Sequence, residues 1–361
     1  MRLQRLATRG LRNLAPGELH TDASFVVFSG LNAQGKTNAL EAIWFLATLR
    51  PLRGFVVRDL IAWGEEEAAV GGTVDGHALK VMQGKSRRLF LEGQAVTQLS
   101  QYFGAVRAVA FSPSDEEVLR GEPRLRRQWL DRAAFTADPS HLDLVRAYHR
   151  ALDQKRALLR SPDPVLLDVL DEQLARTGAA VAEARERMLS ALEPHVTRYH
   201  RELSGDQAVV EPRYRTVAYG RSTADRTGAL HDALQQARAE EVRRGMALVG
   251  PHRDEVRLLL DGRPARTWAS RGQVRSLLLA LKLAELQAAR ERGDAPLFLL
   301  DDLSSELDGD RTRRLVSILE GLGSQVFVTT TDPSHIQGLP EADTLHFSVR
   351  EGQLSALPAA R

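Results

Sequence analysis

The chain has 361 residues, of which 43% are apolar and 27% charged, and it contains no cysteine. This composition excludes a disordered chain, a disulfide-stapled mini-domain and any thiolate chemistry, and it allows one large or two modest domains. No segment reaches the roughly 18 consecutive apolar residues of a membrane span, and the first residues lack the apolar core of a secretion signal, so we expect a cytoplasmic protein.

The first hundred residues predict short strands separated by turns, among them an apolar run at 25–28 that suits a strand covered on both faces. From about Ser112 to Ser204, apolar residues recur at helical spacing. The segment 161–164, Ser-Pro-Asp-Pro, interrupts this pattern and predicts two antiparallel helices that project roughly 30 Å. Strand-like segments return after Gly205. We therefore expect an α/β domain formed by 1–111 and 205–361, with a helical insertion at 112–204.

The segment after the first apolar run fits the phosphate-loop pattern G-x-x-x-x-G-K-[ST] at every fixed position. Its residues are Gly30, Leu31, Asn32, Ala33, Gln34, Gly35, Lys36 and Thr37. In such a loop, backbone N–H groups and the start of the next helix surround phosphate oxygens. Lys36 would reach the β and γ phosphates of ATP, and Thr37 would offer its hydroxyl to Mg²⁺.

A second apolar run at 296–300 ends in two carboxylates, Asp301 and Asp302. A magnesium-bound triphosphate needs an acid at a strand end beside the phosphate loop, and Asp301 suits that role. Asp302 is then placed to orient or deprotonate the attacking water. Lys36 and Asp301 lie 265 positions apart, which excludes the compact arrangement of a GTPase.

The order of motifs resembles the RecF family, in the SMC-like branch of the ABC-type ATPases. The resemblance rests on pieces from the first strand to about Thr331: 30–38 with Leu-Glu-Ala-Ile at 40–43, Pro123 with Arg126 and Arg127, 152–159, Gly-Pro-His-Arg-Asp at 250–254, Ser-Arg-Gly-Gln at 270–273 and 299–308. It implies a P-loop ABC-type ATPase head with two lobes, mixed sheets and an inserted helical domain. The resemblance also implies that Asn38 is one of the nucleotide-binding residues.

The resemblance also implies a homodimer that forms with ATP and encloses two nucleotides. In it, Ser270, Gly272 and Gln273 of one protomer face the phosphate loop of the other, and Asp308 lies near the seam. The implied function is ATP-dependent binding of duplex DNA or a single-strand/duplex junction in recombinational and replication-gap repair. Partners by resemblance are RecO and RecR, and the implied outcome is RecA loading and SOS induction.

Two departures from many ABC ATPases predict slow, weak hydrolysis. Asp302 stands where Glu is frequent, and Thr330 and Thr331 end the strand that often carries a His. A transporter ATPase subunit would have that Glu and His and a signature roughly a hundred residues after the phosphate loop. A chromosome ATPase of the SMC type would have arms of hundreds of residues. Both are weaker alternatives, and a nucleotide switch without turnover is a third.

Three questions stay open from the residues alone. The 49 basic residues are 44 arginines and 5 lysines against 47 acidic residues, which reflects either genomic base composition or a need for bidentate phosphate contacts. Four arginines, Arg120, Arg124, Arg126 and Arg127, could contact DNA or pair with the acidic residues at 115–117 and 122. His252 has no neighbour at metal-ligand spacing, which favours a structural role.

Overall fold

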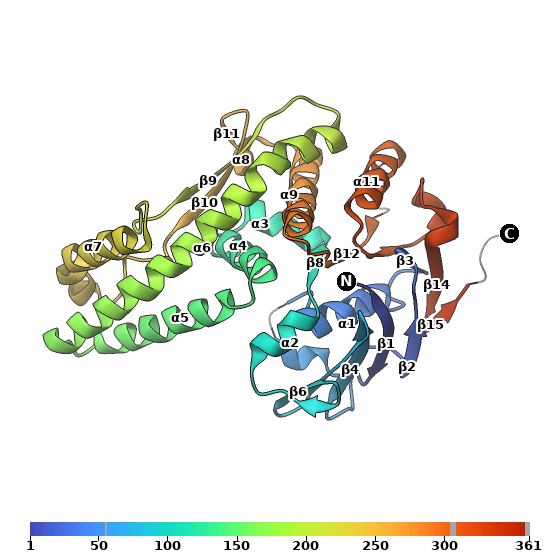
Figure 1. Cartoon of the computed structure of the whole chain (residues 1–361), viewed down its shortest axis with the longest axis horizontal. Coiled ribbons are helices and arrows are strands. Elements are labelled where there is room, and N and C mark those ends of the chain that lie inside the picture. Colours follow the sequence, from blue (N-terminus) through green and yellow to red (C-terminus); the bar gives the residue numbers. More distant parts are fainter. Residues whose placement is uncertain (55, 304–307, 358–361) are drawn as a thin grey trace. The chain divides into compact units, whose positions relative to one another are not determined.

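The structure is a computed structural model, and it describes residues 1–54, 56–303 and 308–357 (Figure 1). The chain divides into two compact units: 1–116 with 198–207 and 271–361, and 117–197 with 208–270. This division differs from the expected one, because 208–270 group with the helical stretch and not with the head. The reason is that β9 (Val210–Arg215) pairs with β10 (Glu255–Leu260), and β10 packs on α4 (Pro123–Ala137).

The first unit contains a six-stranded sheet whose central strands are buried on both faces. Five of its strands run parallel, and only the last pairing, between β14 and β15, is antiparallel. In spatial order the strands are β15 (Gln353–Ala356), β14 (Thr344–Arg350), β3 (Phe25–Ser29), β13 (Val326–Thr330), β12 (Leu297–Leu300) and β8 (Ala108–Phe111). Because the parallel strands end at one edge, the loops after β3, β12 and β13 meet there.

A second six-stranded sheet in this unit is antiparallel throughout. Its strands in order are β2 (Gly17–His20), β1 (Leu3–Arg9), β4 (Ala68–Val74), β5 (His77–Gln83), β6 (Arg87–Leu91) and β7 (Gln94–Ala95). Helix α1 (Lys36–Thr48) contacts strands of both sheets, and its residues are buried almost all round. This explains why α1 is apolar on every side rather than along one stripe.

Other helices complete the first unit. Helix α9 (Arg271–Glu291) packs on β8, and α11 (Gly309–Leu322) packs on α9; Figure 1 shows both on the side of the parallel sheet opposite α1. Helix α2 (Leu99–Ala105) packs on β5 and β6. Short 3₁₀ turns lie at Val57–Leu60, Pro113–Asp115, Pro333–His335 and Glu341–Asp343.

The second unit is mainly helical. Helices α5 (His141–Leu158), α6 (Pro164–Ser204, whose last turns belong to the first unit) and α7 (Thr223–Arg244) pack around one apolar cluster. The hairpin predicted around 161–164 is present as α5 and α6. The remaining elements are α3 (Glu116–Arg120), β11 (Arg263–Pro264) and α8 (Ala265–Trp268).

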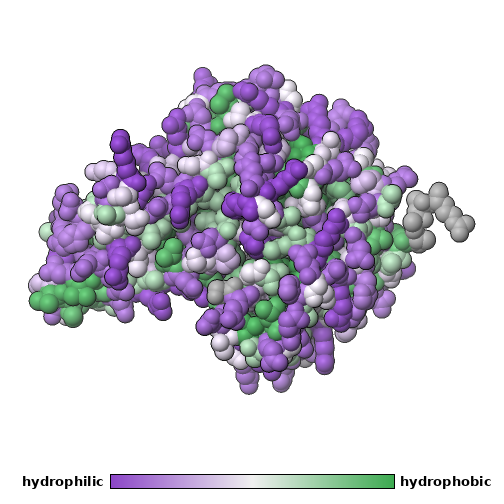
Figure 2. Space-filling view, in the orientation of Figure 1, coloured by the Kyte–Doolittle hydropathy of each residue, from purple (hydrophilic) through white to green (hydrophobic). Residues whose placement is uncertain are grey.

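The surface of the hairpin tip is apolar. Val165, Leu166 and Val169 at the start of α6 are 70%, 52% and 59% exposed, and Figure 2 shows this apolar patch on an otherwise largely hydrophilic face.

No helix among the described residues is both long and apolar enough to cross a membrane.

Candidate nucleotide-binding site

The loop between β3 and α1 has a backbone that only a glycine-rich sequence can adopt easily. Gly30 and Gly35 have φ of 153° and 112°, and Ala33 has φ of 64°. A Cβ at Gly30 would lie 2.3 Å from the carbonyl oxygen of Val349. The loop therefore needs Gly30 for both its dihedral angles and its close approach to β14.

Lys36 begins α1 and points back over the loop. Its Nζ donates hydrogen bonds to the carbonyl oxygens of Gly30 and Leu31 at 2.7 and 2.8 Å. Burial lowers the pKa of Lys36, while the nearby carboxylates of Asp302 and Asp301 act in the opposite direction. The ammonium is thus held at the loop, close to both acids.

Asp301 follows β12 directly and is 1% exposed. Its Oδ1 accepts hydrogen bonds from the hydroxyls of Thr37, at 2.8 Å, and Thr329, at 2.9 Å. Its Oδ2 forms an ion pair with the guanidinium of Arg53. The structure therefore brings together the two predicted metal residues, Thr37 and Asp301, and their hydroxyl and carboxylate oxygens are ligands of the kind that Mg²⁺ prefers.

Asp302 has a left-handed backbone, with φ of 55°, which is uncommon for a residue other than glycine. Its backbone N–H donates to Thr329 Oγ1 at 2.8 Å. One hydroxyl, that of Thr329, thus contacts both acids. The sequence alone assigned Thr329 no role, although it lies at the end of a parallel strand next to β12, which is the signal that could have found it.

The rest of the loop is tied to the turn after β14 and to Asn13. Gln34 accepts from the backbone N–H of Glu351 at 2.7 Å through its side chain and from that of Gly352 at 2.9 Å through its carbonyl. Asn38 donates to Asn13 Oδ1 at 2.7 Å. Leu31, Asn32 and Ala33 form the exposed tip.

A second group of residues that sequence reasoning missed lies one turn along α1. The Glu41 side chain is 3% exposed and accepts from Arg12 Nε at 2.7 Å and from the backbone N–H of Leu52 at 3.1 Å. Glu41 thereby holds the segment from which Arg53 reaches Asp301. Because Arg53 and Asp301 lie 248 positions apart, no local pattern indicates the contact.

The predicted signature residues lie at the start of α9. Ser270 immediately precedes this helix, and Gly272 and Gln273 are in its first turn. The nearest atom to a Cβ built on Gly272 is Arg311 Nη1, at 3.7 Å. Arg311 in turn contacts Asp308, whose side chain accepts from the Arg311 N–H at 2.9 Å. Arg311 thus lies next to both the start of α9 and Asp308, whereas 304–307 lie outside the described residues.

Arg126 and Arg127, whose role the sequence left open, make hydrogen bonds within the second unit. Arg126 is 4% exposed and donates to the carbonyl oxygens of Val256, at 2.8 Å, and Gly121, at 3.0 Å. Arg127 donates to the carbonyl of Asp254 at 2.8 Å. Because Arg126 is buried and its printed partners are backbone carbonyls, it does not make the predicted DNA contact. Arg127 is half-buried, and its predicted contact with DNA stays a prediction.

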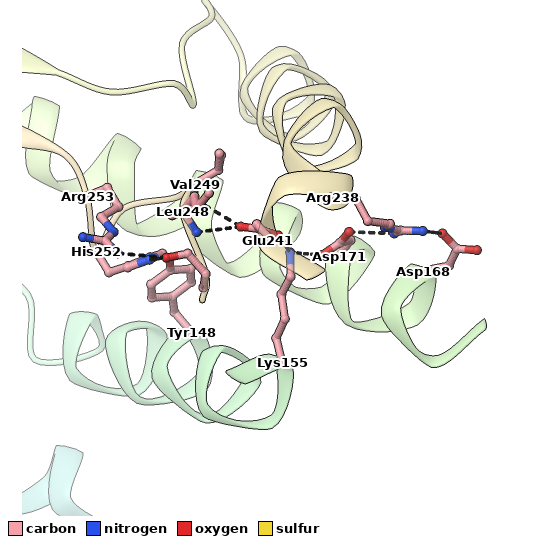
Figure 3. A network of polar contacts seen from close by, with 11 residues as sticks. Tyr148, Lys155, Asp168, Asp171, Arg238, Glu241, Leu248, Val249, His252 and Arg253 are labelled. Carbon is pink, nitrogen blue, oxygen red and sulfur yellow. Dashed lines mark hydrogen bonds and ion pairs between the residues drawn. The ribbon is translucent and has the colours of Figure 1, made fainter. Parts of the chain in front are cut away.

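His252 is also part of a buried polar network (Figure 3). Its Nδ1 lies 2.6 Å from the hydroxyl of Tyr148. Burial lowers the pKa of His252 to about 4. A neutral imidazole held by a tyrosine fits the structural role that the sequence favoured.

Comparisons with known proteins agree with this geometry. The family model described as RecF/RecN/SMC N terminal domain matches residues 2–351. The chain is 40% identical to the DNA replication and repair protein RecF of Geobacter sulfurreducens, over 99% of this chain and 100% of the relative. It is 39% identical to RecF of Myxococcus xanthus, over 98% of this chain and 97% of the relative.

Solved structures give the same result. The structure of the recombination mediator protein RecF-ATP in the RecFOR pathway superposes with a TM-score of 0.88 at 29% identity, covering 99% of both chains. The Smc head bound to the C-winged helix domain of ScpA has a TM-score of 0.56 at 14% identity and shares the fold alone. The expected ATPase-head fold and the resemblance are both confirmed, and this chain belongs to the RecF family of DNA replication and repair proteins.

Proposed function

We propose that this chain is an ATP-dependent DNA-binding protein of recombinational and replication-gap repair. The observation that carries the proposal is the contact between Thr37 and Asp301, which joins the phosphate loop to the acidic strand end in a full-length member of the RecF family. In P-loop NTPases, a Ser or Thr of the phosphate loop and an Asp at a strand end hold the magnesium ion of the nucleotide.

The roles of the residues follow from their positions. Lys36 and the loop N–H groups bind the β and γ phosphates, and Thr37 and Asp301 would hold Mg²⁺. When bound, Mg²⁺ neutralises negative charge on the phosphate oxygens. Asp302, fixed through Thr329, orients the attacking water as general base. Asp302 is one methylene shorter than Glu, and we propose a weak, DNA-stimulated ATPase whose slow turnover times a bound state.

The proposed active form is a homodimer closed by ATP. Ser270, Gly272 and Gln273 of one protomer would contact the γ phosphate bound to its partner, and Asp308 would lie at the seam. Arg311 contacts Asp308 and lies next to the start of α9. The closed dimer binds duplex DNA or a single-strand/duplex junction in the cytoplasm. Acting with RecO and RecR, it promotes RecA loading and SOS induction.

Sedimentation velocity with and without ATP and Mg²⁺ tests the proposal. We expect the wild type to dimerise only with ATP and then to bind duplex or gapped DNA. Lys36→Arg should stay monomeric because the larger, planar guanidinium does not fit where the ammonium bonds to the loop. Lys80→Arg, at an exposed position of β5, is the matched control. A wild type that stays monomeric with ATP and has no affinity for duplex, gapped or single-stranded DNA would overturn the proposal.

A further inference from the structure

The three-stranded sheet of the second unit has one face turned away from its helices. Along β9 and β10, Val210, Pro212, Val256, Leu258 and Leu260 are buried, so the alternate residues form an outer face. Register places these residues in opposed pairs: Arg215 with Glu255, Arg213 with Arg257, and Glu211 with Leu259. Opposed residues of an antiparallel pair share a face, so these side chains are immediate neighbours.

This outer face has more cations than its carboxylates can pair. Glu211 pairs with Arg213, and Glu255 pairs with Arg257 at 2.7 Å, each two residues along its own strand. The Arg215 side chain has no hydrogen bond or ion pair with any residue that the structure describes. Both glutamates are therefore already used, and a positive charge is left over.

The adjoining edge adds further arginines. Arg263 in β11 lies over the ring of Trp268, 5.5 Å from its centroid, and Trp268 is 65% exposed. Arg266 in α8 likewise lacks a side-chain partner among residues 1–54, 56–303 and 308–357. Beneath the sheet, burial lowers the pKa of Arg126, and Arg266 lowers it further, while Glu255 acts in the opposite direction.

Arg213 and Arg257 lie directly opposite each other across the two strands. Like charges directly opposite each other destabilise a sheet. Their side chains are 63% and 46% exposed, so neither is needed to fill the core. Glu211 and Glu255 offset this repulsion, and the two guanidinium groups still lie side by side on an exposed face, where guanidinium can bind phosphate oxygens in a bidentate manner.

We propose that the outer face of β9 and β10, with Arg213, Arg215 and Arg257, binds the sugar-phosphate backbone of DNA. This assignment rests on the proposed function and names the surface that performs it. Arg263, held by Trp268, and Arg266 extend the contact along the edge. The face recognises phosphates, so it binds DNA without regard to base sequence.

The position of this face in the chain links DNA to the nucleotide. Strands β10 and β11 and helix α8 lead directly to Ser270, which follows Trp268 by two residues. Phosphates held along this edge would order the segment that places Ser270.

The first test compares DNA affinity over a range of salt concentrations in the presence of ATP. The triple variant Arg213→Gln, Arg215→Gln, Arg257→Gln should bind duplex DNA at least ~10-fold more weakly, with a slope of log K against log salt smaller by about 3. ATP binding and dimerisation should stay at wild-type levels. The control variant Arg243→Gln, Arg244→Gln removes exposed arginines that pair with Glu240 on α7, and it should bind DNA like the wild type.

A second test uses the absence of cysteine from the sequence. A photoreactive label on Glu211→Cys should crosslink to duplex DNA when ATP is present, and the same label on Glu240→Cys should not. Wild-type affinity and salt slope in the triple variant, or equal crosslinking at both positions, would overturn this assignment alone. A wild type that binds no DNA would overturn the proposed function and this assignment together.

Discussion

Thr329 is the residue on which both acids of the nucleotide site depend. Its hydroxyl is buried, donates to Asp301 and accepts from the backbone N–H of Asp302. Thr329→Val keeps the shape but leaves a buried N–H without its acceptor, at a cost of about 1–3 kcal/mol. We expect kcat for ATP hydrolysis to fall by ~10-fold or more, while ATP affinity measured without Mg²⁺ changes little.

Thr329→Ser is the control for this prediction, because it retains the hydroxyl and should retain hydrolysis. Single-turnover phosphate release separates the chemical step from nucleotide binding. If Thr329→Val released phosphate at the wild-type rate, Thr329 would have no part in holding Asp302.

His252 predicts a pH dependence of stability. Burial, together with Arg253 and Arg156, lowers its pKa from 6.5 to about 4. Below pH 6.5 the unfolded chain takes up a proton that the folded chain does not, so the free energy of unfolding falls as pH decreases from about 6.5 to about 4. The difference amounts to at most about 3 kcal/mol.

Urea unfolding between pH 4 and pH 7 measures this effect. His252→Gln cannot titrate and should show a flatter pH dependence than the wild type, whereas exposed His231→Gln should follow the wild type. An unchanged pH profile in His252→Gln would mean that His252 is not the group responsible.

At the scale of elements, β4 carries two adjacent glycines with opposite environments. A Cβ on Gly72 would lie 2.7 Å from Leu46 Cδ2 on α1 and 3.1 Å from the carbonyl oxygen of Arg5, whereas the nearest atom to a Cβ on Gly71 is 3.6 Å away. Gly72→Ala should therefore displace α1 and lower the free energy of unfolding by about 1–3 kcal/mol. Gly71→Ala, its matched control, should have little effect, and equal denaturation midpoints for the two variants would contradict this account of the packing.

Three helices of the second unit meet at a buried ion cluster (Figure 3). Lys155 of α5 lies 2.6 Å from Asp171 of α6 and 2.5 Å from Glu241 of α7, and all three side chains are fully buried. Lys155→Met would leave the buried carboxylate of Glu241 without its cation, while Asp171 keeps Arg238, and we expect a cost of about 3–5 kcal/mol. Chemical denaturation should show this loss, while exposed Lys85→Met should unfold like the wild type. A loss below about 1 kcal/mol would show that the carboxylates are neutralised in another way.

Sequence reasoning found the features whose cause is local. The phosphate loop was visible because its φ angles require Gly30 and Gly35. Asp301 was visible because a phosphate loop implies an acid at the end of a nearby buried strand. Arg53 was invisible because its partner is remote in the chain. Strand-like segments were predicted after Gly205, at 207–211 and 256–260, near the observed β9 and β10. A period-two pattern does not reveal which sheet a strand joins, so the boundary between the units differed from the expected one.

For the whole molecule, the formal charge of +2 is informative. A chain with so little net charge attracts DNA only through local surfaces, such as the arginines on β9 and β10. One such face makes few phosphate contacts. Two faces joined in a dimer make twice as many, while the protein loses its translational freedom on the DNA only once. ATP-dependent dimerisation would therefore convert weak binding into tight binding without any change in either face.

The dimer proposal predicts complementation between two inactive variants. Lys36→Ala disables the phosphate loop, and Ser270→Arg disables the signature, so each homodimer lacks every complete site. In a mixed dimer, the intact loop of the Ser270→Arg protomer faces the intact signature of the Lys36→Ala protomer. Equal mixing should restore ATPase activity, up to about a quarter of the wild-type value. That limit is reached if the two variants pair at random, since half of the dimers would then be mixed and each has one of two sites intact. Mixing two separate preparations of Lys36→Ala is the control. If each site were completed within a single protomer, mixing would restore nothing, because neither chain carries both intact parts.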